Sequence, residues 1–356
     1  NQALLNNASS IQNSLDSWVP PAGIKVIQIV GWGLDTIRGI RYDDCDIPLC
    51  PNNLSNLDRD PVFTLDGDKT VVVPSANAIQ GVDTYYLNLR DYNQELFLNA
   101  RRNRDHVDIF EVDSIQELVK SIIIDGTDNL PKHITTTKPI FTDNDRSLRF
   151  RVYSPVFLDV YDSSGNHTGL VPNFDPNSDL RSVEANIPNS YYLEFGEAKY
   201  SGSGSPDDIT IVLTGEAVGT FTLEIDELSG DVVSVTTIFK DIPVVENTHG
   251  VVEIKNESAP LSLSLDIDND GISDAVIEPG LGVNTEEVVN ILRGIMKTLN
   301  LTDKQKTRLN KVLNRIDKVL AKEGGCDEKK KQEKCENRIK HRLSNTLERL
   351  HKTLER

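Results

Sequence analysis

The stretch that decides the fold is Gly23–Trp32, which reads GIKVIQIVGW. It contains the longest apolar run of the chain, interrupted by one Lys, one Gln and one Gly. The run is far shorter than the roughly 18–20 apolar residues that a membrane helix needs. Its Ile and Val content favours a strand buried on both faces, as in a parallel sheet. We therefore predict a parallel strand at Gly23–Val30 and no transmembrane segment.

Two further elements complete the pattern of an α/β sheet. A second strand is predicted at Asp83–Leu89, after a segment rich in Pro, Gly and Asp that we predict to be a long loop. Ser114–Ile124 has apolar residues on one helical face, and Ser114 with Glu117 has the spacing of a capping box. The order strand, long loop, strand, loop, helix is typical of the second half of an α/β fold. We assign residues 1–130 to this part.

After residue 140 the pattern changes to short alternating runs. Turn residues separate these runs, as in an antiparallel β-sandwich. We predict an Ig-like accessory sandwich over residues 140–262. Its expected strands are Leu148–Tyr153, Val156–Tyr161, Tyr191–Phe195, Ile209–Leu213, Thr220–Ile225 and Val232–Phe239.

Helical spacing dominates the C-terminal part of the chain. Apolar stripes predict three amphipathic helices in residues 284–356. One of these helices is expected to start near Thr302-Asp303. We predict that the helices pack their stripes together as a small bundle. A short helix is also expected at residues 1–17. The stripes are Val288, Ile291, Leu292, Ile295 and Leu299; Leu309, Val312, Leu313, Ile316, Val319 and Leu320; and Ile339, Leu343, Leu347, Leu350 and Leu354.

Charge and cysteine usage limit the class of protein. The formal net charge is −17, although residues 284–356 hold 19 Lys and Arg against 11 Asp and Glu. The acidic excess therefore lies in the preceding part, and this argues against nucleic-acid binding there. The four cysteines form two close pairs, and two local disulfides with an extracellular or cell-surface location are the simplest interpretation. The pairs are Cys45 with Cys50 and Cys326 with Cys335.

Candidate catalytic residues lie between and after the two predicted strands. Asp66–Val71 reads DGDKTV, and His106 comes after the second strand and shortly before the predicted helix. In α/β-hydrolases the catalytic residues follow the chain order Ser, Asp, His. The His acts as general base and then as general acid, while the Asp orients the imidazole and stabilises its charged form.

These segments resemble the lecithin:cholesterol acyltransferase-like branch of the α/β-hydrolases over about residues 1–125. The family has a G-x-G-x-x-T segment, matched by Gly31–Thr36 (GWGLDT), a GDxTV segment with the catalytic Asp, and a His on a late loop. The resemblance implies catalytic roles for Asp68, rather than Asp66, and for His106. No G-x-S-x-G occurs in the chain, so the nucleophilic Ser is expected upstream and the chain alone is expected to be inactive.

A second candidate site is an acidic segment at residues 263–283. Its carboxylates stand at loop positions 1, 3, 5 and 9, with Gly at position 6, which is the spacing of calcium loops. Position 12 is Ile277, so the segment is not an EF-hand. We predict a structural Ca²⁺ site and no organic cofactor; the alternative is a plain acidic turn. The expected ligands are Asp266, Asp268, Asp270, the carbonyl of Ile272, and Asp274.

The sequence is compatible with two classes of function. The first is the C-terminal part of a secreted bacterial-type lipase, esterase or acyltransferase acting on lipid-like esters. The fold is then multidomain: the end of an α/β-hydrolase domain, an antiparallel β-sandwich and an all-α module. The second is a non-enzymatic surface, adhesion or carbohydrate-binding protein, in which the β and helical parts associate with a cell surface.

Overall fold

The chain forms two compact units in the computed structural model. The first contains Asn1–Phe150, Asn166–Pro206 and Asp226–Thr236, and the second contains Arg151–Gly165, Asp207–Ile225 and Thr237–Arg356. Each unit thus draws on segments that are far apart in the sequence. The structure describes residues 2–43, 58–100, 102–124, 129–143, 145–153, 155–171, 181–204, 208–255, 260–280, 285–299 and 301–320.

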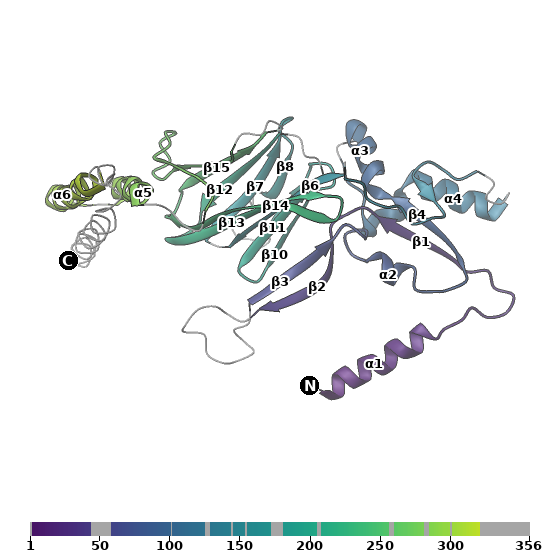
Figure 1. Ribbon diagram of the computed structural model, residues 1–356. Coiled ribbons are helices and arrows are strands. Elements are labelled where there is room, and N and C mark those ends of the chain that lie inside the picture. The colour runs from purple at the N-terminus through teal and green to yellow at the C-terminus, as the bar shows by residue number, and fades with distance from the viewer. Residues whose placement is uncertain are drawn as a thin grey trace, which may run out of the picture. The chain divides into compact units, whose positions relative to one another are not determined.

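A small sheet with strand order β1-β4-β5 organises the first unit. Strands β1 (Ile27–Trp32) and β4 (Asp83–Asn88) are parallel, and β5 (Ile134–Thr135) pairs antiparallel with β4. Helices α3 (Leu89–Ala100) and α4 (Asp113–Ile124) lie beside β1 and β4 (Figure 1). They share a core with the sheet whose fully buried members include Leu87, Leu89, Val112 and Leu118. The predicted strand at residue 83 and the helix ending at Ile124 are confirmed.

Two details of this part differ from the prediction. The first strand begins at Ile27, four residues later than expected, and runs on to Trp32. Helix α4 begins at Asp113, so Ser114 is buried in its first turn and the predicted capping box is wrong. A short 3₁₀ helix, η2 (His106–Glu111), precedes α4 instead. It has a capping box of its own, in which the side chain of Asp105 accepts from the N–H of Val107 and the side chain of Asp108 accepts from the N–H of Asp105.

The predicted long loop between the first two strands contains an antiparallel hairpin. Strand β2 (Thr36–Asp43) pairs with β3 (Asp58–Thr64), with a register shift between Ile37 and Gly39. Nearly every described side chain of β2 after Thr36 is exposed. The hairpin therefore has no continuous buried apolar face on β2, and the alternation that identifies half-buried strands is missing. Helix α1 (Gln2–Asp16) precedes β1, as expected, and the four-residue helix α2 (Val73–Ala76) follows β3.

The remainder of the chain is mostly antiparallel β structure, and each predicted β run is found as a strand. In the first unit β8 pairs with β9 and β10 pairs with β11; in the second the order is β17-β16-β15-β12-β7. Strands β6, β13 and β14 include residues of both units. The strands are β6 (Arg146–Tyr153), β7 (Val156–Asp162), β8 (His167–Val171), β9 (Ser182–Ala185), β10 (Tyr191–Phe195), β11 (Ala198–Ser203), β12 (Ile209–Gly215), β13 (Gly219–Ser229), β14 (Val232–Val244), β15 (His249–Ile254), β16 (Leu263–Asp266) and β17 (Ala275–Ile277).

Two helices of the second unit pack on each other through their apolar stripes. Helices α5 (Thr285–Thr298) and α6 (Asp303–Leu320) lie side by side (Figure 1). Their shared core contains Val289, Leu309, Val312, Leu313 and Ile316. Leu299, expected in the first stripe, is exposed beyond the end of α5. The predicted helix start is confirmed, because α6 begins at Asp303.

Some predictions fall outside the described residues. These are the third helical stripe and both cysteine pairs, Cys45 with Cys50 and Cys326 with Cys335. A search of the described helices finds none that is long and apolar enough to cross a membrane.

Candidate functional site

Asp68 and His106 meet in the first unit of the structure. The Nδ1 atom of His106 lies 2.9 Å from Oδ2 of Asp68, and the backbone N–H of His106 donates to the carbonyl oxygen of Asp68 at 3.0 Å. Asp68 is 3% exposed, whereas the side chain of His106 is 44% exposed. Asp68 lies in the turn between β3 and α2, and His106 begins η2. A buried carboxylate thus fixes one ring nitrogen of an accessible imidazole.

The turn around Asp68 holds its carboxylate in one orientation. Oδ1 of Asp68 accepts hydrogen bonds from the N–H of Val71 at 2.7 Å and of Thr70 at 3.2 Å. Lys69 has a φ of +85°, and its N–H donates to Oγ1 of Thr36 at 2.8 Å. Backbone donors to a carboxylate compensate for its burial. Oδ2 therefore remains directed at the imidazole.

The Gly31–Thr36 segment forms the wall against which this turn packs. Leu34 and Asp68 form a parallel β-bridge, and the N–H of Leu34 donates to the carbonyl of Gly67 at 3.0 Å. A Cβ atom added to Gly31 would lie 2.6 Å from Cβ of Asp68, and Gly33 has a φ of +101°. Gly31 is therefore needed for the close approach to Asp68, and Gly33 for a backbone conformation that other residues rarely adopt.

Gly31→Ala is expected to lower the free energy of unfolding by about 1–3 kcal/mol, the usual cost of forcing an extra atom into a packed site. The added Cβ would overlap Asp68, and this overlap can be relieved only by moving the turn. Urea denaturation of the two forms measures the effect. Gly39→Ala in β2 is the matched control, since a Cβ there meets no atom within 4 Å. Equal stability of Gly31→Ala and the parent would contradict the close approach of the Gly31 backbone to Asp68.

The two aspartates of the DGD segment have different partners. Asp66 forms an ion pair with Lys138, and its buried Oδ1 has no hydrogen-bond partner in the part of the chain that the structure describes. Asp68 is the one that reaches His106. The second Asp of the segment, and not the first, is therefore the one that contacts the imidazole.

Thr36 is a site residue that reasoning from the sequence missed. Its hydroxyl donates to the carbonyl of Leu34 at 2.8 Å and accepts from the N–H of Lys69. It therefore joins the wall segment to the turn that contains Asp68. The available signal was its position as the Thr of the G-x-G-x-x-T segment.

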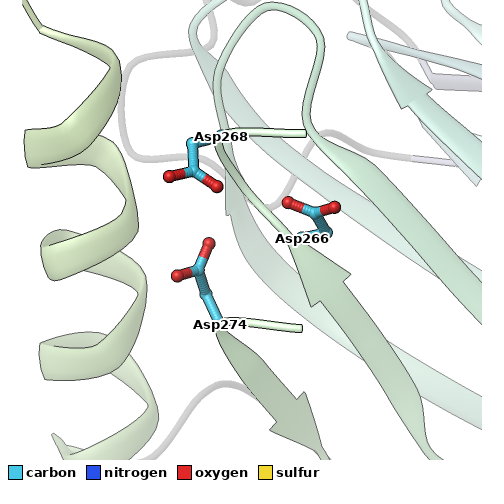
Figure 2. Close-up of side chains that lie close together, drawn as sticks. All are labelled: Asp266, Asp268 and Asp274. Atoms are coloured by element: carbon cyan, nitrogen blue, oxygen red, sulfur yellow. The ribbon is translucent and has the colours of Figure 1, made fainter. Parts of the chain in front are cut away.

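The acidic loop between β16 and β17 is the second candidate site, in the other unit. Asp266, Asp268 and Asp274 each offer a carboxylate oxygen, and these oxygens lie within 4.8 Å of one another (Figure 2). Asp270 is not part of this group: it is exposed, and its Oδ1 accepts from the N–H of Ile272 at 2.9 Å. Three of the four predicted carboxylates therefore converge.

A lysine from α5 faces the three carboxylates. Nζ of Lys297 lies 2.7 Å from Oδ1 of Asp274 and 3.2 Å from Oδ2 of Asp268. These hydrogen bonds, the one to Asp274 first, raise the pKa of Lys297 above its usual value. The ammonium group supplies positive charge to the cluster, and its side chain is half exposed. Oδ1 of Asp268 is shielded from solvent and has no hydrogen-bond partner within the described residues.

Comparisons with known proteins add no information on either candidate site. Comparison with protein-family models, with curated proteins and with solved structures finds no match to this chain.

Proposed function

We propose that Asp68 and His106 are the acid–base half of a Ser-Asp-His triad in a secreted carboxyl-ester hydrolase or acyltransferase. In this proposal residues 1–130 are the C-terminal part of an α/β-hydrolase domain, and the nucleophilic Ser lies upstream of this chain. Residues 140–262 form an accessory β-sandwich. The observation that carries the proposal is the 2.9 Å contact between a buried, oriented carboxylate and the Nδ1 atom of an accessible imidazole.

The topology supports the same assignment. Along the chain, Asp68 lies between the parallel strands β1 and β4, after the hairpin β2–β3, and His106 lies after β4 and α3. In α/β sheets the functional groups gather beyond the carboxyl ends of such strands. The intervening hairpin β2–β3 returns the chain to β1, where the N–H of Gly33 donates to the carbonyl of Leu65 at 3.1 Å. Residues from both strand ends therefore meet although 38 residues separate them.

In this proposal each atom of the pair has its own role. Because Nδ1 of His106 donates to Asp68, Nε2 is the nitrogen left to accept a proton. As the Ser Oγ bonds to the ester carbonyl carbon, Nε2 takes the hydroxyl proton and Asp68 stabilises the imidazolium. Nε2 then protonates the departing alcohol as its C–O bond breaks. Water or an acceptor alcohol repeats these steps on the acyl-enzyme, so the choice between hydrolysis and transfer depends on the acceptor.

A fluorophosphonate probe tests this proposal. It should label one Ser of the longer polypeptide that contains the preceding sequence, and His106→Ala should abolish labelling because the base is lost. Labelling should be absent from this chain alone. A non-enzymatic surface or carbohydrate-binding protein predicts no labelling in either polypeptide, and this result would reject the hydrolase.

We further propose that the acidic loop binds Ca²⁺ as a structural ion. Carboxylate oxygens suit Ca²⁺, and its coordination geometry tolerates an irregular loop. The convergence of Asp266, Asp268 and Asp274, with one shielded oxygen of Asp268 lacking a partner among the described residues, supports this proposal. Lys297 is the competing cation and has to move aside when the metal binds.

Millimolar Ca²⁺ is therefore expected to raise the Tm of this chain more than Mg²⁺ does. A concentration of 100 times Kd corresponds to about 2.7 kcal/mol of stabilisation. Asp268→Ala should abolish the response, whereas Asp270→Ala, which removes an exposed carboxylate of the same loop, should retain it. Lys297→Met should lower the Tm without metal and enlarge the rise with Ca²⁺. If Ca²⁺ changes the Tm of neither the parent nor Lys297→Met, the Ca²⁺ proposal is rejected and the loop is an ion cluster of carboxylates with Lys297.

A further inference from the structure

One carboxylate from a distant hairpin holds the strand that leads into the Asp68 turn. Asp231 lies between β13 and β14, and its Oδ1 accepts from the N–H of Leu65 at 2.9 Å while its Oδ2 accepts from Oγ1 of Thr64 at 2.8 Å. The N–H of Asp66 in turn donates to Oγ1 of Thr64 at 3.1 Å. Three consecutive residues before Gly67-Asp68 thus depend on a side chain 166 residues away from Leu65.

Arg149 binds the residue next to Leu34, on the other strand of the Leu34–Asp68 bridge. Nε of Arg149 in β6 donates to Oδ1 of Asp35 at 2.8 Å. Its Nη2 forms an ion pair with the same oxygen at 2.6 Å and lies 3.6 Å from Oδ1 of Asp231. Asp35 follows Leu34, the residue that forms the β-bridge with Asp68. The cluster Asp35–Arg149–Asp231 therefore holds both strands of that bridge.

Two members of the cluster, Asp35 and Arg149, are largely buried. The side chains of Asp35 and Arg149 are 5% and 14% exposed. Burial raises the pKa of Asp35, and the charge of Arg149 opposes this rise. Hydrogen bonds between buried charged groups are strong and directional, and breaking one leaves an uncompensated charge. The Asp35–Arg149 pair is therefore held in place, and Asp231, whose side chain is 34% exposed, lies beside it.

We infer that Asp231 is a positioning residue for the Asp68–His106 pair, an inference that rests on the proposed function of that pair. The carbonyls of Leu65 and Gly67 accept from Gly33 and Leu34, so a shift of Thr64–Asp66 passes directly to the turn that orients Asp68. Displacements of about 1 Å at a catalytic group can cost about 10²-fold in rate. Asp231 would act on the turn from outside residues 1–125, the part of the chain that resembles a hydrolase.

The hydrogen bond from His106 to Asp68 provides a direct readout. Its Nδ1 proton should give a downfield proton NMR signal in this chain at low temperature, and His106→Gln identifies that signal by removing it. Asp231→Asn keeps the size of the side chain but replaces an acceptor oxygen with an NH₂ donor. We expect it to weaken or abolish the signal in a protein that remains folded, and to lower turnover about 10²-fold in the whole enzyme.

Variants of Thr64 and Asp226 complete the test. Thr64→Val should also lose the signal, and Thr64→Ser should restore it because only the hydroxyl is needed. Asp226→Asn is the matched control in the same hairpin. The side chain of Asp226 accepts from Oγ1 of Thr236, whereas that of Asp231 accepts from Thr64 and Leu65. An unchanged signal in Asp231→Asn and Thr64→Val would overturn the inference. The signal needs no substrate, so absence of ester turnover in the unsubstituted whole enzyme would count against the proposed function alone.

Discussion

Asp68→Asn and His106→Ala are each expected to lower ester turnover about 10⁴-fold in the polypeptide that contains the nucleophile. Asp68→Asn keeps the shape of the turn, but an amide nitrogen can replace the oxygen that accepts from Nδ1. The imidazole then adopts the wrong tautomer and its charged form loses its partner. His106→Ala removes the proton acceptor itself. Initial rates on a chromogenic acyl ester measure both effects.

The control for these variants is a carboxylate on the same sheet. Asp83→Asn at the start of β4 removes one half of an exposed ion pair with Lys25, and such pairs contribute little. Its turnover should match that of the parent. Circular dichroism should show all three variants folded, because His106 is partly exposed and Asp68→Asn preserves volume. Turnover within tenfold of the parent in both site variants would reject the triad assignment.

Arg149→Leu is expected to lower the free energy of unfolding by about 3–5 kcal/mol at neutral pH, as when one partner of a buried ion pair is removed. The substitution leaves Asp35 buried without the guanidinium that binds it, and it also removes the positive charge nearest to Asp231. Urea denaturation at several pH values measures the loss. Arg146→Leu on the same strand is the control, because Arg146 forms a more exposed pair with Glu227 and should cost under about 1 kcal/mol.

The pH dependence of the Arg149→Leu deficit follows from the pKa of Asp35. Burial raises that pKa in the folded state, and removing Arg149 raises it further. A carboxyl group with a raised pKa binds its proton more tightly in the folded form. Its contribution to stability is present below the unfolded pKa and is lost as the pH rises through the folded pKa. The deficit should therefore be small in acid and reach its full size towards neutral pH. A deficit that does not vary with pH would reject this assignment.

Local patterns predicted the elements whose physics is local. Alternating side chains identified β6, β7, β10, β12, β13 and β14, and the 3.6-residue period identified α4, α5 and α6, because each has one buried face. Strands β8, β9 and β11 were not predicted. The hairpin β2–β3 was missed because nearly all described side chains of β2 are exposed, so its pairing leaves no apolar pattern. The predicted cap at Ser114 was wrong because η2 lies just before α4 and the chain enters the helix at Asp113.

The sequence by itself determined the order of the candidate residues, namely Asp68 between two strands, His106 after the second, and four spaced carboxylates near residue 270. The resemblance already favoured Asp68 over Asp66, and in the tertiary structure Asp68 contacts His106. Only the tertiary structure decided that Asp270 stays apart and that Lys297 faces the acidic loop. It alone brought Asp231 to Leu65. A hydrogen bond needs about 3 Å between its atoms whatever the separation along the chain. Hydrogen-bond partners contributed by another strand or helix therefore cannot be predicted from the spacing of residues along the chain.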